Sequence, residues 1–395
     1  MVPKVFNNLY IITLFALLWF LVESTDFRSP AIFNFGDSNS DTGGLAAGVA
    51  YPTGLPNGET HFHKSSGRIC DGRLIIDFLM DSLELPFLNP YLDSIGAPSF
   101  QNGCNFATGG STILPANAAS LSPFSFGIQV SQFIRFKARV LEILDEGRKA
   151  TKFLPQKENF ALGLYAIDIG QNDLDGAFYS KSEEEVVPLI PTILSELEAG
   201  IQKLYDQGAR RYWIHNTGPL GCLPRIIAMF GNDTLKLDEF GCVNSHNRVA
   251  KLFNSQLHTL CKKFQERYSD ISVTYIDIFS IKLNLISNFS EYGFKQPIAA
   301  CCGFGGLPLN YDKRIPCVSR RVSETIGGVV LLTSLSKTDA VGVSGSDETG
   351  DGCDNSSANV FTSSVVVSTF SSPISFQVSK LTIFQVKSLL QLKHI

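Results

Sequence analysis

Three short clusters of Gly, Ser, Asn and Asp contain the residue types needed for acyl transfer. The first runs from Gly36 to Gly43 and includes Ser38, whose hydroxyl can act as a nucleophile on a sharp turn beside a helix amino end. The second runs from Gly103 to Gly110 and the third from Gly170 to Asp173. A glycine N–H and an asparagine side-chain amide are suitable donors to an oxyanion. Taken singly, the first cluster is more simply explained as a polar turn.

The hydrophobic pattern places each cluster after a strand-like run. Alternating strands and helices predict an α/β fold with a parallel sheet, and sites in such folds lie at the carboxyl ends of the strands. The three clusters should therefore meet at one edge of one sheet. The expected strands are 31–35, 159–169, 211–216 and 271–278, with a weak strand before Phe106–Ile113. The expected helices are 74–83, 128–144 and 244–268. A further helix is expected to be capped by Ser182 and Glu185 and to end near Gly208, and Pro188 and Pro191 fall near its first turns or split it.

Composition excludes several classes of protein. The chain has 395 residues, 44% hydrophobic and 18% charged, which permits a large buried core and excludes global disorder. Lys and Arg total 33 against 37 Asp and Glu, for a net charge of -4, so no basic surface is expected and nucleic acid is not an expected partner. We find no internal repeat.

The amino terminus has the pattern of a secretory signal peptide. Lys4 precedes the uncharged apolar run Leu9–Val22, which is short for a membrane span, and cleavage is expected near Ser24. No later stretch is apolar enough to span a bilayer. We expect a secreted protein, located outside the cell or in a cell wall. The candidate glycosylation sites are Asn232, Asn288 and Asn355, and the candidate disulfide cysteines are Cys222, Cys242, Cys261, Cys301, Cys302, Cys317 and Cys353.

Together and in this order, the three clusters resemble blocks I, II and III of the GDSL lipase/esterases, also called SGNH hydrolases. The resemblance runs from about Pro30 to Cys317 and is close to the large plant secreted branch. It implies a three-layer α/β/α, flavodoxin-like fold with a central parallel sheet of about five strands. Further matching stretches are Gly67-Arg68, Asp71-Gly72-Arg73, Asn105-Phe106-Ala107, the run from Gly218 to Pro224, and Cys301-Cys302-Gly303.

Carried over by position, the resemblance implies that Ser38 is the nucleophile. It implies an oxyanion hole made by the Ser38 N–H, the Gly110 N–H and the Asn172 side-chain amide. The implied substrates are small-molecule or polymeric carboxylic esters, and no metal or organic cofactor is implied.

The family's fourth element, an Asp-x-x-His motif near the carboxyl terminus, is absent. The lead-in at Gly352–Ser357 continues into a tail without acidic residues, and no Asp or Glu lies three residues before His394. The other histidines are expected to be structural or surface residues. They are His61, His63, His215, His246 and His258.

The missing motif leaves the activity of the chain open. A serine without its base is weakly nucleophilic near neutral pH, so the chain as written is expected to be close to inactive. Either a retained intron or shifted frame has replaced the true ending of an active esterase, or the chain is a non-catalytic pseudoenzyme or binding protein. The expected segments are a signal peptide at 1–24, a hydrolase domain at 25–317, an atypical insertion at 318–349, a hydrolase remnant at 350–360 and an atypical tail at 361–395.

Overall fold

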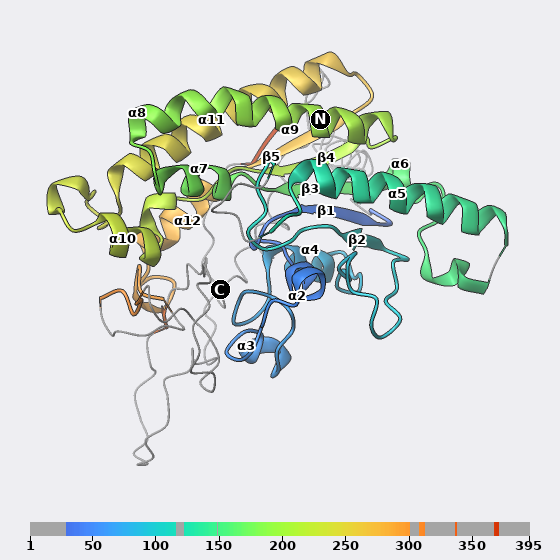
Figure 1. Ribbon diagram of the computed structural model, residues 1–395, viewed down its shortest axis with the longest axis horizontal. Helices are drawn as coiled ribbons and strands as arrows, with labels where there is room; N and C mark the ends of the chain where they lie inside the picture. The colour runs from blue at the N-terminus through green and yellow to red at the C-terminus, as the bar shows by residue number, and fades with distance from the viewer. Residues whose placement is uncertain are drawn as a thin grey trace, which may run out of the picture.

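A computed structural model describes residues 29–115, 122–147, 149–300, 308–312, 336–337 and 367–370. A central sheet with strand order β2-β1-β3-β4-β5-β8 forms the middle layer (Figure 1). The first five strands are parallel, and their 2-1-3-4-5 order is the flavodoxin-like one, which confirms the expected fold. They are β1 (Ile32–Gly36), β2 (Gly103–Asn105), β3 (Leu164–Asp168), β4 (Arg211–His215) and β5 (Ser272–Ile276).

Two segments from the predicted atypical regions also form strands. β8 (Val367–Phe370) adds to the edge of the sheet and pairs antiparallel with β5. β7 (Ser336–Lys337) pairs antiparallel with β6 (Phe294–Gln296) in a separate two-stranded sheet. The expected hydrolase remnant at 350–360 lies outside the described residues.

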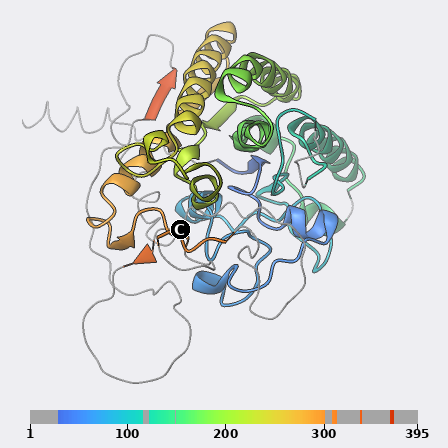
Figure 2. The ribbon, with the colours of Figure 1, turned by 60° about the vertical axis from the view of Figure 1, so that its left-hand side comes forward.

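Helices cover both faces of the sheet (Figures 1 and 2). α5 (Phe126–Asp145), α9 (Ile190–Asp206) and α11 (Asn244–Arg267) lie on one side, and α4 (Ile75–Ser82) lies on the other. The arrangement is the predicted three-layer one. The remaining helices are α2 (Gly44–Val49), α3 (Glu59–Phe62), α6 (Asn159–Leu162), α7 (Gln171–Phe178), α8 (Glu183–Val186), α10 (Pro224–Phe230) and α12 (Ile278–Ser287).

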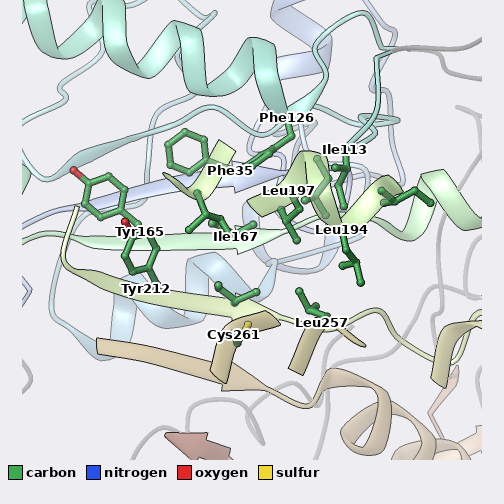
Figure 3. Close-up of a cluster of buried hydrophobic side chains, with 14 of the residues drawn as sticks. Phe35, Ile113, Phe126, Tyr165, Ile167, Leu194, Leu197, Tyr212, Leu257 and Cys261 are labelled. Atoms are coloured by element: carbon green, nitrogen blue, oxygen red, sulfur yellow. The ribbon is translucent and has the colours of Figure 1, made fainter. Parts of the chain in front are cut away.

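Successive strand residues divide between the two faces, as the alternation of side chains in a strand requires. Phe33, Tyr165 and Tyr212 are buried in the larger core beneath α5, α9 and α11, and Figure 3 shows part of this cluster. Ile32, Ala166 and Trp213 are buried in the smaller core against α4. A sheet buried on both faces explains why its strands were detectable as continuous apolar runs.

Two predicted elements differ in their bounds. The strand expected over 159–169 begins only at Leu164, because Asn159–Leu162 forms the short helix α6. The helix expected between Ser182 and Gly208 is divided into α8, a 3₁₀ turn at Val187–Leu189 and α9. Proline lacks an N–H and clashes with the preceding turn of a helix, so Pro188 and Pro191 account for the division.

The cysteine predictions are only partly confirmed. Cys222 and Cys242 form a disulfide, whereas Cys261 is a free, buried thiol, so that candidate was wrong. Burial of Cys261 in the apolar core beneath α11 keeps it from a partner. The predicted signal peptide and the candidates Cys301, Cys302, Cys317 and Cys353 lie outside the described residues. None of the helices described is both long and apolar enough to cross a bilayer.

Candidate active site

The turn that carries Ser38 follows directly from the end of β1. The Gln129 side chain of α5 holds Gly36 by accepting from its N–H at 2.9 Å and donating to its carbonyl at 2.8 Å. Asp37 then donates its N–H to the Asp168 carbonyl on the neighbouring strand at 3.2 Å. A Cβ on residue 36 would clash with the Ser40 hydroxyl and the Asp168 carbonyl, so only glycine fits. The turn is therefore fixed to two strands and one helix.

Ser38 is 5% exposed at this turn. Its Oγ has no hydrogen-bond partner among the described residues. The hydroxyl is thus held at the carboxyl edge of the sheet without a described group positioned to take its proton.

The 107–114 loop, which contains Gly110, leaves the end of β2 beside the serine turn. The buried Asn105 side chain joins the two segments by donating to the Ser40 carbonyl at 2.7 Å and to the Thr42 hydroxyl at 2.9 Å. Gly110 has φ +77°, a left-handed conformation that favours glycine. The second cluster therefore lies against the first, as predicted from their positions after adjacent strands.

Asn172 stands in the first turn of α7 and contacts both other clusters. Its Nδ2 donates to the Ser111 carbonyl at 2.9 Å and to Asp37 Oδ2 at 3.3 Å. Ser111 is next to Gly110, and Asp37 is next to Ser38. Asn172 therefore joins the immediate neighbours of the other two predicted site residues in one hydrogen-bonded group.

A set of buried and partly buried titratable groups surrounds Asp37. Burial and the neighbouring Asp168 carboxylate raise the pKa of Asp37 to about 8, although hydrogen bonds from Asn39 and the charge of Lys282 oppose the rise. Asp168 Oδ2 lies 3.2 Å from His215 Nδ1, an ion-pair distance without hydrogen-bond geometry. Burial lowers the pKa of Lys282, while Asp168 and Asp37 oppose that shift. Two carboxylates and two basic side chains thus share the space next to the serine turn.

Two further carboxylates connect the same segments through backbone amides. Asp173 Oδ2 accepts from the Ile113 N–H at 2.7 Å, and its Oδ1 accepts from the Leu114 N–H at 3.0 Å. The Asp41 carboxylate accepts from four N–H groups, three in the serine segment and one in the 107–114 loop. Those donors are Gly43, Gly44, Leu45 and Gly109.

A small cavity lies between the sheet and α4, beside this group. Its volume of about 20 Å³ is enough for one water molecule. Asp168, His215, Ser40 and Trp213 contribute to its lining, and none of the three predicted site residues is among its described lining residues. The cavity is therefore not the place where an ester would meet Ser38.

Four of the histidines occupy the structural or surface positions expected for them. His61 and His63 are exposed, and the His258 ring packs against Tyr275. His246 is buried and stacks on Phe178, and burial lowers its pKa to about 4. His394 lies outside the described residues. Over the described ranges, no three His, Cys, Asp or Glu side chains gather where they could hold a metal ion.

The candidate glycosylation sites lie away from the serine turn in sequence. Asn232 is exposed in the turn after α10, and Asn288 is partly exposed at the end of α12. Asn355 lies outside the described residues. An exposed asparagine in a turn is sterically open to modification.

Sequence reasoning did not identify the roles of Asp41 and Asp173 or the pairing of Asp168 with His215. Both loop-binding aspartates belong to clusters that sequence inspection had singled out. Their amide partners are distant in the sequence, up to 68 positions away, so no local pattern could have revealed them.

Comparison with known proteins finds the same likeness over most of the chain. Residues 32–339 match the family model described as GDSL-like Lipase/Acylhydrolase. Two relatives from Arabidopsis thaliana, each named GDSL esterase/lipase, are 55% identical, one over 344 residues (80% of this chain and 84% of the relative) and the other over 296 residues (74% and 77%). A protein from Hevea brasiliensis named esterase is 44% identical over 322 residues (79% and 80%).

Proposed function

The chain belongs to the GDSL-like lipase/acylhydrolase family and is by family a carboxylic ester hydrolase, and from this premise we propose that Ser38 is its nucleophile. One observation carries the proposal. The Asn172 amide bridges the residues next to Ser38 and Gly110, so three distant segments converge on one point. Acyl transfer needs a hydroxyl and hydrogen-bond donors at one point, and the meeting of these three segments supports the proposal that Ser38, Gly110 and Asn172 supply them.

In the proposed reaction, Ser38 Oγ attacks the ester carbonyl carbon and loses its proton. Charge gathers on the carbonyl oxygen, which accepts hydrogen bonds from the Ser38 N–H, the Gly110 N–H and the Asn172 side-chain amide. For this the Asn172 amide gives up its 3.3 Å hydrogen bond to Asp37, because its NH₂ group has only two hydrogens. The alkoxy group leaves as an alcohol, taking a proton and leaving an acyl-enzyme. Water then attacks the acyl carbon, releasing the carboxylic acid and restoring the Ser38 hydroxyl.

We propose that this turnover is impaired in the chain as written. The proton of Ser38 needs an acceptor, no described residue accepts a hydrogen bond from its Oγ, and the Asp-x-x-His motif is missing from the sequence. Loss of the base in a comparable triad costs about 10⁶ in kcat and leaves about 10³–10⁴ over the reaction in water.

A pair of proteins tests the nucleophile and the impairment together. One is the chain as written, and the other carries an ending with the family's Asp-x-x-His motif in place of its own tail. With a short-chain aryl ester, the second protein should turn over far faster than the first, and Ser38→Ala should abolish its turnover. Unchanged turnover after Ser38→Ala would reject the role of Ser38, and equal turnover by the two endings would reject the impairment.

The Asn172 role has its own test in the chain with the replaced ending. Asn172→Ala removes one oxyanion donor and should lower kcat by about 10²–10³, equivalent to about 2.7–4 kcal/mol. Steady-state kinetics with the same ester measures the loss. A change of less than about twofold would remove Asn172 from the oxyanion hole.

The second candidate function is a non-catalytic pseudoenzyme that binds acylated polymers or another protein. The absence of any described hydrogen-bonding base at Ser38 favours it. Labelling of Ser38 by a fluorophosphonate, followed by mass spectrometry, separates the two candidates. Labelling as fast as in an intact relative would count against the non-catalytic function. Sequencing of the 3′ end of the transcript would show whether the message encodes this tail or an Asp-x-x-His ending.

We also propose that the protein is secreted. The apolar amino-terminal run and the sequons support this location, as does the Cys222–Cys242 disulfide, because disulfides persist in oxidising compartments.

A further inference from the structure

The 107–114 loop is held from both sides by buried carboxylates. Near its start, Asp41 Oδ2 accepts the Gly109 N–H at 2.7 Å, one residue before Gly110. At its end, Asp173 accepts the N–H groups of Ile113 and Leu114 at 2.7 and 3.0 Å. Both side chains are almost fully buried, Asp41 at 0% and Asp173 at 6% exposure. The loop with Gly110 is therefore fixed to the serine segment by one carboxylate and to α7 by the other.

We propose that Asp41 and Asp173 are positioning residues that set the Gly110 amide relative to Ser38 and to the Asn172 side chain. The inference rests on the proposed function, because it assigns the parts that assemble the proposed oxyanion hole. Neither carboxylate has to touch substrate. Each acts through the backbone of the loop, whose displacement by about 1 Å can be enough to cost about 10²-fold in rate.

Asp173 has the more specific role of the two. Asp41 also accepts from Gly43, Gly44 and Leu45 at the start of α2, so it caps that helix as well as holding the loop. Asp173 lies in the first turn of α7, yet both of its oxygens accept amides from the loop, about 60 positions earlier in the chain. A change at Asp173 therefore tests the attachment of the loop most directly.

The attachment depends on Asp173 being ionised. An ionised carboxylate only accepts hydrogen bonds, whereas protonation turns one oxygen into a donor that faces an N–H. Burial raises the pKa of Asp173 to about 7, and the N–H groups of Ile113 and Leu114 oppose the rise. The loop should therefore lose one of its two hydrogen bonds to the Asp173 carboxylate as the pH falls through about 7.

The charged groups on the surrounding elements are engaged elsewhere. On α7 itself, Asp175 pairs with Arg225 of α10. On α8, Glu183 pairs with Arg248 of α11 at 2.5 Å. On α11, the buried His246 stacks on Phe178, and on the serine turn Asp37 accepts from Asn172. The 107–114 loop itself contains no titratable side chain.

Amide hydrogen exchange on the full chain tests the inference without requiring turnover. Asp173→Asn keeps the shape of the side chain but replaces one acceptor oxygen with an NH₂ group. At pH 8 it should speed exchange in a peptide covering 109–114 by on the order of tenfold, as expected for loss of a hydrogen bond to a charged group. Exchange in α9 should not change. Asp145→Asn, at an exposed position ending α5, is the matched control and should leave both segments unchanged.

The wild-type chain provides a second measurement that needs no variant to fold. Protection of the Ile113 and Leu114 amides, corrected for intrinsic exchange, should fall between pH 8 and pH 6. Constant protection across this range would overturn the inference, as would an Asp173→Asn protein whose 109–114 exchange matches wild type.

Turnover then separates a positioning role from a purely structural one. In the chain with the replaced ending, Asp173→Asn should lower kcat and leave KM unchanged. It should also make the fall in rate below about pH 7 less steep, because only the histidine base then titrates there. If Asp173→Asn has the same kcat and pH profile as the unsubstituted chain with the replaced ending, the positioning role is overturned. If Ser38→Ala leaves turnover unchanged, the proposed function fails, whereas the exchange experiment still decides whether Asp173 holds the loop.

Discussion

Two aspartates near Ser38, Asp37 and Asp41, have different partners although they are only four positions apart. The Asp41 carboxylate accepts only backbone amides, which favours ionisation even though burial raises its pKa. The Asp37 carboxylate is buried and faces Asp168, and both effects raise its pKa, whereas hydrogen bonds from Asn39 and the charge of Lys282 oppose that rise. Because one of its oxygens accepts the Asn172 amide, the charge of Asp37 bears on the same donor that the proposed reaction uses.

The raised pKa of Asp37 predicts a pH dependence of stability. Its pKa is about 8 in the folded protein against an ordinary value of 3.8, so the folded state favours the protonated form. The resulting stability is complete below about pH 4 and is lost as the pH rises through about 8. Asp37→Asn removes this titration. The melting temperature of the variant minus that of wild type should therefore become more positive from pH 5 to pH 9, because only wild type loses this stability as the pH rises. Differential scanning calorimetry measures the difference, with Asp145→Asn as control, and a constant difference across pH would contradict the assignment.

At the scale of elements, α5 links the core to the site. Its Phe133 ring is fully buried and packs edge-on against Phe33 of β1 at 5.3 Å and Phe106 at 5.9 Å. One turn earlier, Gln129 holds the Gly36 backbone at the end of β1. One helix therefore fixes both the middle of β1 and the start of the serine turn.

This packing predicts the cost of shortening the central side chain. Phe133→Ala should lower the free energy of unfolding by about 3–5 kcal/mol, because it leaves a cavity among aromatic rings. Ile128→Ala, at a position on the same helix that is 42% exposed, is the control and should cost much less. Urea denaturation of both variants measures the difference. Equal losses would show that α5 is not packed as described.

The disulfide makes a separate prediction for the α10 region. Cys222 and Cys242 are 20 positions apart, and closing a loop of that size stabilises a protein by about 3 kcal/mol in the chain-entropy model. Peptide mapping without reduction should find the linked pair, and Cys222→Ala with Cys242→Ala should lower the melting temperature. Recovery of both cysteines as free thiols would contradict the pairing.

At the scale of the whole molecule, a family fold is joined to regions that the family pattern did not predict. Residues 32–339 match the family model, and β8 from the later tail pairs with the edge of the sheet at β5. An added edge strand covers backbone groups that would otherwise remain unpaired. The central sheet is therefore continuous from β2 to a strand that no sequence motif indicated.

Secretion predicts a chemical mark on the whole molecule. Expressed from its first residue in a eukaryotic host, the protein should appear in the medium with a glycan on Asn232, which is exposed in the turn after α10. Glycosidase treatment and peptide mass analysis detect the glycan. Asn232→Gln removes the acceptor and should abolish the mass difference at that peptide, while retention of unmodified protein in the cell would contradict secretion.

Local patterns were enough to predict the class of fold and the positions of its parts. Apolar runs marked the strands because both faces of the sheet are buried. The motifs identified the family because each of them is a continuous stretch of sequence. The predicted bounds of an element were wrong where two elements adjoin without a break in hydrophobicity, as at α6 and β3. They were also wrong where two prolines interrupt one amphipathic pattern.

The residue types at the sheet edge and their order along the chain follow from the amino-acid sequence alone. Which of them meet depends on the fold, because the hydrogen bonds of Asp173 to the 107–114 loop and of Asn172 to Asp37 join positions 59 to 135 residues apart. Contacts of this kind arise when adjacent strands bring distant turns together. No periodicity or short motif along the chain encodes that pairing, which is why the site's supporting carboxylates emerged only with the fold.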